Sequence, residues 1–394
     1  MNDLAVTNIG HLTTNDGDPI REAVIIIRDG VIEYVGRRSD APMFGNLEVL
    51  DCESRSVIPA FVDAHTHLLF AGDRSDELRR RMEGEDYTTI AAAGGGILST
   101  VRATRAASKP DLFAEGMSRL VVMIENGTTA LEIKSGYGLD LKTEQRILKV
   151  ARLMKRETGI PIRITFLGAH AIPPEYANNR DGYVDLLLDI MLPAVADLAD
   201  DCDVFIDRGA FTIDEGRAIL TRAKELGMGL RVHAEQLSHT GAARLAAELG
   251  ASSADHLDHA TAEDAVALSE AGVAAVLTPG ASFMMRQPQA PGPMFWEAGC
   301  VVAIATDCNP GTSFIDSMTF VISLAVIQMG LTFEQALWAA TRGGALALGM
   351  EDRGILRSGA PGDFIVLNAV SPEHIVYRPA TDLIWETFIQ GEAP

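Results

Sequence analysis

The sequence predicts an α/β fold, a (β/α)8 TIM barrel with a small β-sandwich-like domain built from both chain termini. Three features lead to this prediction. Short β-branched apolar runs alternate with helix-length amphipathic segments, β-like pieces lie near both ends of the chain, and the apolar runs end in polar side chains. The predicted barrel covers residues 57–345, and the small composite domain combines residues 1–56 with residues 346–394.

The N-terminal part contains β-like segments that precede the barrel. Ala23–Arg28 and Val31–Val35 are joined by Asp29-Gly30, a dipeptide that strongly favours a tight hairpin turn. Near the other end of the chain, Gly359–Asn368 has the pattern of a turn followed by a strand. We therefore expect the two termini to complete one small sheet together.

The central part alternates between predicted strands and predicted helices. The eight predicted strands are Val57–Asp63, Thr128–Lys134, Ile162–Gly168, Asp203–Ile206, Gly229–His233, Ser252–His256, Val273–Thr278 and Val301–Thr306. The helix-length stretches include Phe113–Asn126, Lys142–Glu157, Tyr183–Ala199, Asp214–Leu226, Thr240–Leu249, Thr261–Ala271 and Ser317–Met329. Eight units of this kind are what a TIM barrel requires.

Composition and charge exclude several classes of partner. The chain has 33 basic and 54 acidic residues, a formal net charge of -21, so its field repels phosphate backbones and anionic membranes. Neither nucleic acid nor a membrane is an expected partner. The first residues lack a basic segment followed by an apolar core, and no apolar run approaches the roughly 18 residues of a membrane span. We expect a cytoplasmic protein, and a homodimer because that assembly is the commonest.

The cysteine pattern is also what we expect of a cytoplasmic protein. They show no paired short spacing of the zinc-ribbon or disulfide-scaffold kind, and a chain of 394 residues needs no covalent staples. We expect reduced thiols at Cys52, Cys202, Cys300 and Cys308.

Polar side chains follow the predicted strands where each strand ends, which is the edge of a TIM barrel that carries catalytic residues. The residues concerned are His65, His67, Tyr137, His170, His233, His256 and Asp307. Nothing in folding a barrel requires such residues there, so their convergence predicts an active site.

His65 and His67 stand two residues apart, so on an extended strand both side chains project to the same side. Neutral imidazoles suit zinc or iron, and His233 and Asp307 at other strand ends are candidates for further ligands. One divalent ion held in this way would lower the pKa of a bound water from about 15.7 towards about 7. The alternative is a set of hydrogen-bonded structural histidines, with Asp307 capping the turn at Asn309-Pro310-Gly311.

Other candidate residues surround this predicted centre. His256 is a candidate proton carrier or oxyanion donor, with a structural histidine as the alternative. Arg74 follows the histidine pair closely, and its guanidinium could bind a substrate carboxylate through two bonds. Gly94-Gly95-Gly96 has neither the dinucleotide-binding nor the P-loop pattern and is expected to form a mobile loop. The arginines of TVRATR, residues 100–105, could cover an anionic ligand.

Motifs along nearly the whole chain resemble the amidohydrolase superfamily and, more narrowly, the imidazolonepropionases of histidine breakdown. HxH alone would indicate only the superfamily. The narrower resemblance depends on HTH with FAGDR (70–74), GGGI (94–97), EIKSGYGL (132–139), TFLGAHAIPPEY (165–176), RVHAEQL (231–237), SADHL (253–257) and ATDCNPGTS (305–313).

This resemblance implies a role for each matching residue. Metal ligands would be His65, His67, His233 and Asp307, with one zinc or iron ion per chain. Catalytic residues would be His256, Asp307 and Gln236, and substrate contacts would be Arg74, Tyr137, His170, Gln236, Asn309, Gly311 and Thr312. The family often has Cys-Glu where this chain has Ile206-Asp207, and some members have Glu where Gln236 stands. The second departure removes a possible base and leaves the protons to His256 and Asp307.

The implied reaction is hydrolysis of the lactam C–N bond of the small molecule 4-imidazolone-5-propanoate to N-formimidoyl-L-glutamate, without a redox step or organic cofactor. One alternative is a deaminase of the same superfamily, acting on a ring such as cytosine or guanine. Those enzymes usually place a glutamate where Gln236 stands, and Glu235 points elsewhere on the strand. A second alternative is a non-catalytic metal-binding scaffold, which would not need Arg74, Tyr137, His170 and His256 around the ligands.

Overall fold

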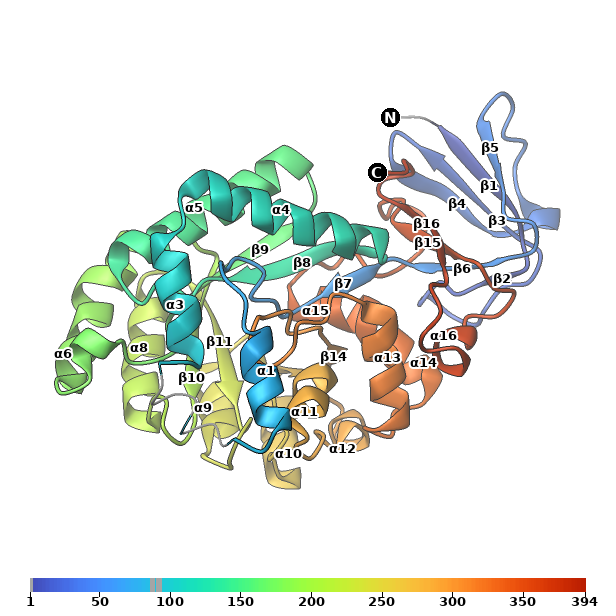
Figure 1. Ribbon diagram of the computed structural model, residues 1–394. Coiled ribbons are helices and arrows are strands. Elements are labelled where there is room, and N and C mark those ends of the chain that lie inside the picture. The colour runs from blue at the N-terminus through green and yellow to red at the C-terminus, as the bar shows by residue number, and fades with distance from the viewer. Residues whose placement is uncertain (1–2, 86–88, 90–93) are drawn as a thin grey trace.

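The computed structural model describes residues 3–85, 89 and 94–394 of the chain, and its main body is a barrel of parallel strands (Figure 1). The barrel sheet has eight strands in chain order, which confirms the predicted fold class. They are β7 (Phe61–Asp63), β8 (Thr128–Lys134), β9 (Ile162–Ala169), β10 (Asp201–Ile206), β11 (Gly229–Ala234), β12 (Ser253–His256), β13 (Ala274–Leu277) and β14 (Val302–Ile304).

The first and eighth strands meet just beyond their carboxyl ends, which brings the two edges of the barrel sheet together. The backbone N–H of Asp307 donates to the carbonyl of His65, and the backbone N–H of His67 donates to the carbonyl of Cys308. The N···O distance is 3.0 Å in both bonds. Below them, the Asp63 carboxylate accepts bonds from the backbone N–H and the hydroxyl of Thr306 at 3.1 and 2.6 Å. The barrel is therefore joined at the rim that carries the predicted ligands.

Helices cover the outside of the barrel and lie between successive strands (Figure 1). The longer ones begin at side-chain caps, and Ser108, Thr212 and Thr261 each form a capping box with an acid three residues on. The bounds are α1 (Ser75–Met82), α3 (Ile97–Ala106), α4 (Lys109–Glu125), α5 (Leu141–Thr158), α6 (Arg180–Leu186), α8 (Ile213–Glu225), α9 (Ala242–Leu249), α10 (Ala262–Ala271), α11 (Pro279–Met285), α12 (Gly292–Glu297), α13 (Met318–Ile327), α14 (Phe333–Trp338) and α15 (Gly344–Ala347).

One predicted helix differs in the structure. Tyr183–Ala199 was expected to be regular, but α6 passes into a π-helical turn at Leu187–Met191 before α7 (Leu192–Val195). Pro193 lies in the first turn of α7 and has no N–H to donate to the preceding turn. The wider π turn accommodates the missing donor.

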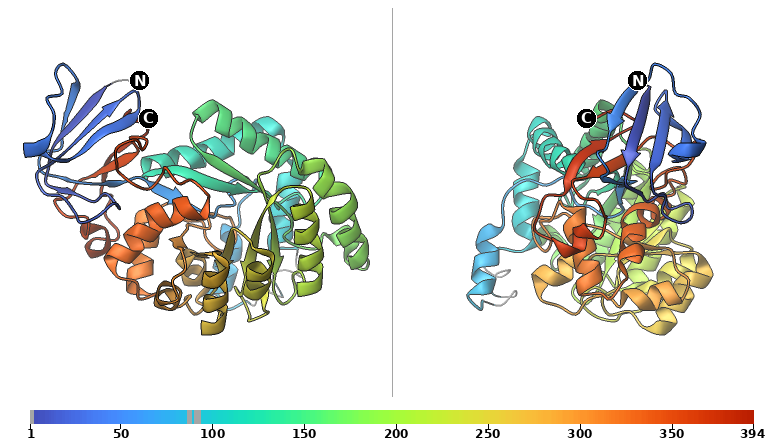
Figure 2. Two further views of the ribbon diagram at one scale, coloured as in Figure 1. Left: turned by 180° about the vertical axis from the view of Figure 1, so that it is seen from behind. Right: turned by 90° about the vertical axis from the view of Figure 1, so that its right-hand side faces the viewer.

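The segments near the two ends form a small β unit beside the barrel (Figure 2). One of its sheets has the order β4-β3-β1-β5 and the other has the order β16-β15-β6-β2. Their bounds are β1 (Leu4–Ile9), β2 (His11–Leu12), β3 (Ala23–Arg28), β4 (Val31–Arg37), β5 (Glu48–Asp51), β6 (Ser56–Pro59), β15 (Phe364–Leu367) and β16 (Ile384–Phe388), and α16 (His374–Tyr377) lies between the last two.

The predicted hairpin and the predicted joining of the termini are both present in this unit. β3 and β4 pair antiparallel around Asp29 and Gly30, whose φ angles of 49° and 79° suit a tight turn with both residues left-handed. β15 pairs antiparallel with β6, so a strand from the C-terminal part completes an N-terminal sheet. The two sheets share one apolar core, to which Val6, Ile25 and Phe364 contribute fully buried side chains.

The first predicted strand, Val57–Asp63, is two strands in two different sheets, so the prediction of one continuous strand is wrong. β6 pairs with β15 and β2 in the small unit, whereas β7 pairs with β8 in the barrel. The change falls at Pro59-Ala60: the Ala60 N–H donates to Asp363 of the small unit, and the Phe61 N–H donates to Gly127 of the barrel. The domain bounds 1–56, 57–345 and 346–394 remain predictions.

The structure also describes the state of the cysteines and the apolar character of the helices. All four cysteines are unpaired thiols. Within the described ranges, no helix combines the length and the apolar character that crossing a membrane requires.

Candidate active site

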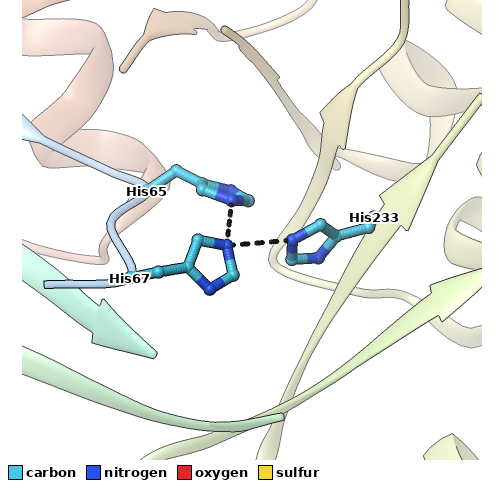
Figure 3. A group of neighbouring side chains, drawn as sticks. All are labelled: His65, His67 and His233. Carbon is cyan, nitrogen blue, oxygen red and sulfur yellow. Dashed lines mark hydrogen bonds between the residues drawn. The ribbon is translucent and has the colours of Figure 1, made fainter. Parts of the chain in front are cut away.

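Three imidazoles meet at the carboxyl rim of the barrel (Figure 3). His65 and His67 follow β7, and His233 projects from β11 on the other side of the barrel interior. Nε2 of His67 lies 3.2 Å from Nε2 of His65 and 3.3 Å from Nε2 of His233. The structure thus brings together the three histidines that the sequence pattern singles out as ligands.

Asp307 and His256 complete the same cluster. Oδ1 of Asp307 lies 3.5 Å from Nε2 of both His65 and His67. The ring of His256 is 5.1 Å from the rings of both His65 and His233. The φ angles of His256 and Asp307 are 77° and 50°, a region that costs energy for residues with a side chain. The barrel holds both residues in strained conformations at the centre of the site.

Carboxylates lie behind two of the imidazoles. Nδ1 of His65 is 2.6 Å from Oδ2 of Asp255, and Nδ1 of His233 is 2.9 Å from Oδ2 of Asp203. A carboxylate accepts hydrogen bonds, so Nδ1 of His65 carries the proton and its Nε2 presents a lone pair to the centre, which is the arrangement found behind metal-ligating histidines. Nδ1 of His233 lies at a similar distance from its carboxylate but without hydrogen-bond geometry.

The electrostatics keep the rings of His65 and His67 neutral. Burial lowers the pKa of His65 and of His67 well below the usual value, and neighbouring cationic and imidazole groups lower it further. Burial also raises the pKa of the Asp307 carboxyl well above its usual value, and a cation at the centre would oppose that shift. The cluster thus combines the neutral imidazoles of His65 and His67 with a buried carboxyl group whose ionised form a cation would stabilise.

The spacing of these atoms fits a small divalent ion. Four atoms bound about 2.1 Å from one ion at the corners of a tetrahedron lie about 3.4 Å apart. Nε2 of His67 lies 3.2 and 3.3 Å from Nε2 of His65 and of His233, and Oδ1 of Asp307 lies 3.5 Å from Nε2 of both His65 and His67. Two imidazole nitrogens at this distance either share a proton or have a cation between them, and the spacing of His65, His67, His233 and Asp307 fits such a cation.

His170 and Tyr137 lie beside the cluster, as predicted from their places after the third and second strands. The His170 ring stacks on His67 with centroids 5.1 Å apart and planes at 19°, and the Tyr137 ring is 5.4 Å from His170. Burial lowers the pKa of His170 to about 3, so this imidazole is neutral as well. Its Nδ1 is 3.1 Å from the Gly136 carbonyl, which holds the ring in place.

Arg74 and the loop after β14 form the next layer. The space beside Gly311 is filled by the Arg74 guanidinium, because a Cβ added at Gly311 would lie 2.2 Å from Nη1 of Arg74. Oδ1 of Asn309 accepts bonds from the backbone N–H groups of Gly311 and Thr312, both at 2.8 Å. Arg74 also donates to Glu77 from Nε and Nη2, at 3.0 and 2.8 Å.

Gln236 has no hydrogen bond that connects it to the other described residues of the site. It is buried two residues beyond β11, and its side chain makes no hydrogen bond to another described residue. Its neighbour Glu235 points away from the cluster as predicted, since its carboxylate accepts bonds from the backbone N–H groups of Thr240, Gly241 and Ala243 ahead of α9. Glu235 therefore serves the fold at this corner.

The arginines of residues 100–105 lie on α3 and are engaged with protein groups. Arg105 donates to the Gly138 carbonyl and pairs with Asp140 and Glu175 at 3.1 and 2.8 Å, and Arg102 bonds to the Gly94 carbonyl. The glycine segment before α3 is thus bonded to that helix through the Gly94 carbonyl. Nothing in this geometry leaves the arginines directed at an anionic ligand.

Sequence reasoning missed the charged residues behind the cluster. They lie on four barrel strands and point into the barrel: Glu132 and Lys134, Asp201 and Asp203, Arg231, and Asp255. All six are buried, and Arg231 and Asp255 stand two residues from His233 and Ser253. Polar residues two apart within otherwise apolar strands were the signal available in the sequence, because alternate residues share one side of a strand.

A barrel whose strand ends gather histidines and an aspartate around an ion-sized space is the architecture of a metal-dependent hydrolase. Residues 88–393 match the family model described as "Amidohydrolase family". The structure also resembles 5-methylcytosine deaminase from Klebsiella pneumoniae, with a TM-score of 0.75, 15% identity and coverage of 99% of this chain and 96% of that chain. An adenosine deaminase from Xanthomonas campestris with bound zinc gives a TM-score of 0.71 at 18% identity, covering 100% and 92%.

Curated relatives narrow the class. Imidazolonepropionase from Symbiobacterium thermophilum is 44% identical, covering 99% of this chain and 96% of its own. That from Salinispora tropica is also 44% identical, covering 99% and 98%. The chain belongs to the imidazolonepropionase family within the amidohydrolase superfamily, whose members are hydrolases that use a divalent metal ion.

Proposed function

We propose that this protein hydrolyses the lactam C–N bond of 4-imidazolone-5-propanoate and releases N-formimidoyl-L-glutamate, a step of histidine degradation. The observation that carries the proposal is the set of contacts that links His65, His67, His233 and Asp307 at the rim of the barrel. The relatives of this chain, 44% identical over nearly the full length, are imidazolonepropionases. The reaction adds one water and breaks one C–N bond, so it needs no organic cofactor.

These four residues are the proposed metal ligands. When bound, a divalent ion supplies Lewis acidity and makes water a better nucleophile at neutral pH. Three imidazole nitrogens and one carboxylate accept either zinc or iron, so we propose one ion of either kind per chain. We further propose, on the sequence grounds given above, a homodimer in the cytoplasm that has no nucleic-acid partner.

His256 and Asp307 are the proposed proton carriers. The Thr278 hydroxyl lies 2.7 Å from Nδ1 of His256 and fixes the orientation of the ring, and the ring stands beside the ligand imidazoles. We propose that His256 stabilises the negative charge that develops on the lactam oxygen. Asp307 would accept the proton of the attacking water and pass it to the departing nitrogen.

The remaining side chains would bind and orient the substrate. The Arg74 guanidinium would bind the propionate arm. Tyr137 and His170, whose rings contact the ring of His67, would flank the imidazolone ring of the substrate. The other proposed contacts are Gln236, Asn309, Gly311 and Thr312. Fixing both the ring and the arm holds the lactam carbon in one attack geometry.

A ring deaminase is the second candidate, because solved structures of similar fold include deaminases. Those likenesses are 15–18% identical and concern the fold alone. Gln236 stands where such deaminases usually carry a glutamate, and an amide cannot move a proton as a carboxylate does. Hydrolysis of the lactam is therefore the proposed activity.

The test is to incubate the purified, metal-loaded protein with freshly prepared 4-imidazolone-5-propanoate. We expect loss of the imidazolone absorbance and no ammonia. Cytosine and guanine serve as comparison substrates in the same assay. Ammonia release from either ring, without turnover of the imidazolone, would replace the proposal with the deaminase.

A further inference from the structure

One buried lysine connects the supports of two proposed metal ligands. Lys134, the last residue of β8, is completely buried below the histidine cluster. Its Nζ donates to Oδ2 of Asp203 at 2.8 Å and to Oδ2 of Asp255 at 3.3 Å. These are the same two oxygen atoms that contact Nδ1 of His233 and Nδ1 of His65. A single ammonium is thus shared between the carboxylates behind two ligand imidazoles.

The arrangement joins five strands through one charged group. His65 follows β7, Lys134 ends β8, Asp203 lies on β10, His233 on β11 and Asp255 on β12. A shift of either carboxylate would turn the imidazole that it contacts. The lysine contacts both carboxylates at once, so it fixes the two rings relative to one another.

Charge balance gives the second reason. Lys134 also pairs with Glu132 at 2.8 Å, so three buried carboxylates surround its ammonium. Burial alone would lower the pKa of Lys134, but Asp203, Glu132 and Asp255 together raise it above the usual value, so the group stays charged. Without that charge, the carboxylates would repel one another in a region of low dielectric.

We propose that Lys134 is a positioning residue, which holds Asp203 and Asp255 so that His65 and His233 present their Nε2 lone pairs to one divalent ion. The inference rests on the proposed ligand set. It assigns to Lys134 no contact with the ion or the substrate. The expected consequence of removing it is a weaker metal site in a barrel that is otherwise folded.

The test measures zinc affinity of the metal-free protein by competition with a chromophoric chelator, so it does not depend on turnover of any substrate. We expect Lys134→Met to weaken zinc binding by about 10–100-fold, the usual effect of losing a group that supports a metal ligand. Lys134→Gln keeps two hydrogen-bond donors without the charge, so it should weaken binding less than Lys134→Met does.

Arg231→Met is the matched control. Arg231 is a second buried cation of the same interior. It bonds to Asp201 at 2.9 Å, to Ser253 at 3.0 Å and to the Ala347 carbonyl at 2.9 Å, and it pairs with Glu132 at 3.2 Å. Glu132 also pairs with Lys134, but none of these four groups hydrogen-bonds to a proposed ligand. Its loss should destabilise the fold but change zinc affinity less than about threefold, because the groups behind the histidines stay in place.

A mutational cycle separates positioning from a general loss of structure. In the Asp203→Asn/Asp255→Asn background the carboxylates are already gone, so adding Lys134→Met should weaken zinc binding less than about threefold further. The same 10–100-fold loss in both backgrounds, or no loss in either, would overturn the proposal. If circular dichroism shows that Lys134→Met does not fold, Lys134→Gln takes its place in the cycle. The same comparison of zinc affinities in the two backgrounds then decides the proposal.

These outcomes are distinct from failure of the proposed function. A protein that fails to hydrolyse 4-imidazolone-5-propanoate would still show whether zinc affinity depends on Lys134. A protein that hydrolyses the imidazolone with unchanged zinc affinity in Lys134→Met would keep its function and refute the positioning role.

Discussion

The interior of the small β unit and the interior of the barrel rim are equally buried but differ in chemistry. In the small unit, Phe364 and Phe388 stack with centroids 4.5 Å apart, and apolar side chains fill the space between the two sheets. Below the rim, Lys134, Asp203 and Asp255 are buried completely, and the lysine pairs with both carboxylates. Apolar burial stabilises a fold directly, whereas buried charges repay their desolvation only in part. The difference indicates that the rim is built to position groups and the small unit to stabilise.

The backbones of the two regions differ in the same sense. In the small unit, the left-handed residues Asp29 and Gly30 form the turn of a hairpin. At the rim, His256 and Asp307 are left-handed inside the site itself. Strain held at such a place is typical of functional residues, because the surrounding structure must maintain it.

The largest expected effect is at a ligand. His67→Ala removes one of the nitrogens that face the shared centre, so the protein should lose its metal and turnover should fall by at least about 10³-fold. Elemental analysis and the absorbance assay measure the two effects. His374→Ala, on α16, is the control and should keep both. Full metal occupancy in His67→Ala would contradict the ligand assignment.

His256→Ala sharpens the comparison within the rim. We expect this variant to retain the metal and the fold while turnover drops by about 10²–10⁴-fold, the scale of proton transfer or oxyanion stabilisation. Substrate binding should change much less. Metal content, circular dichroism and steady-state kinetics test this together, and loss of metal or near-normal turnover would remove His256 from the mechanism.

Phe364→Ala tests the other region. Its ring is completely buried against Phe388, so its loss should lower the free energy of unfolding by about 3–5 kcal/mol. Metal content and KM of the folded protein should stay as in the wild type. Urea unfolding measures the first effect, and Val370→Ala, which is exposed, should stay within about 0.5 kcal/mol of the wild type. A loss of metal affinity in Phe364→Ala would show that the two regions are not separate in function.

Arg74→Met concerns substrate choice at the edge of the rim. Loss of a charge-assisted contact should weaken binding of the propionate-bearing substrate by about 2–3 kcal/mol, seen as a higher KM. Arg79→Met, exposed on the same helix α1, is the control. If the wild type turns over an unsubstituted imidazolone as well as the propionate form, Arg74 has no such role.

The smallest effect is a pH dependence of stability at a buried carboxyl away from the ligands. Burial raises the pKa of Asp258 from 3.8 to about 7, although Ser282 and the Ala290 N–H donate to it. Between these values the folded protein holds a proton that the unfolded chain releases, so the stabilising contribution present below pH 3.8 is lost as pH rises through about 7.

The free energy of unfolding of the wild type should therefore fall between pH 5 and pH 8. In Asp258→Asn, which has no carboxyl to ionise, we expect this fall to be smaller by about 1–3 kcal/mol. Urea midpoints at the two pH values measure this difference. Asp18→Asn, at an exposed position, should follow the wild type. Identical pH profiles for the wild type and Asp258→Asn would show that this carboxyl ionises normally in the folded protein.

Much of the fold follows from local pattern. The alternation of β-branched runs with amphipathic segments predicts the barrel, and β8 coincides with the predicted strand Thr128–Lys134. Pattern could not reveal that Val57–Asp63 serves two sheets, because both halves are apolar and only the long-range partners Asp363 and Gly127 separate them. The π turn before Pro193 is likewise a local adjustment that helical periodicity does not encode.

The candidate site shows the same division. His65, His67, His233, His256 and Asp307 can be predicted to converge, because the carboxyl ends of barrel strands meet at one rim. The sequence does not reveal which carboxylate stands behind which imidazole, because pairs such as His65 and Asp255 are 190 residues apart. Such contacts depend on the register between strands, which only the folded barrel specifies.

The most direct test of the proposed activity is to run the reaction in water enriched in oxygen-18 and to analyse the product by mass spectrometry. Hydrolysis of the lactam C–N bond predicts N-formimidoyl-L-glutamate with one oxygen-18 in the new carboxylate and no release of ammonia. Unchanged, unlabelled imidazolone, together with release of ammonia from cytosine or guanine and oxygen-18 at the ring carbon that lost its amino group, would contradict the account and assign the site to a deaminase.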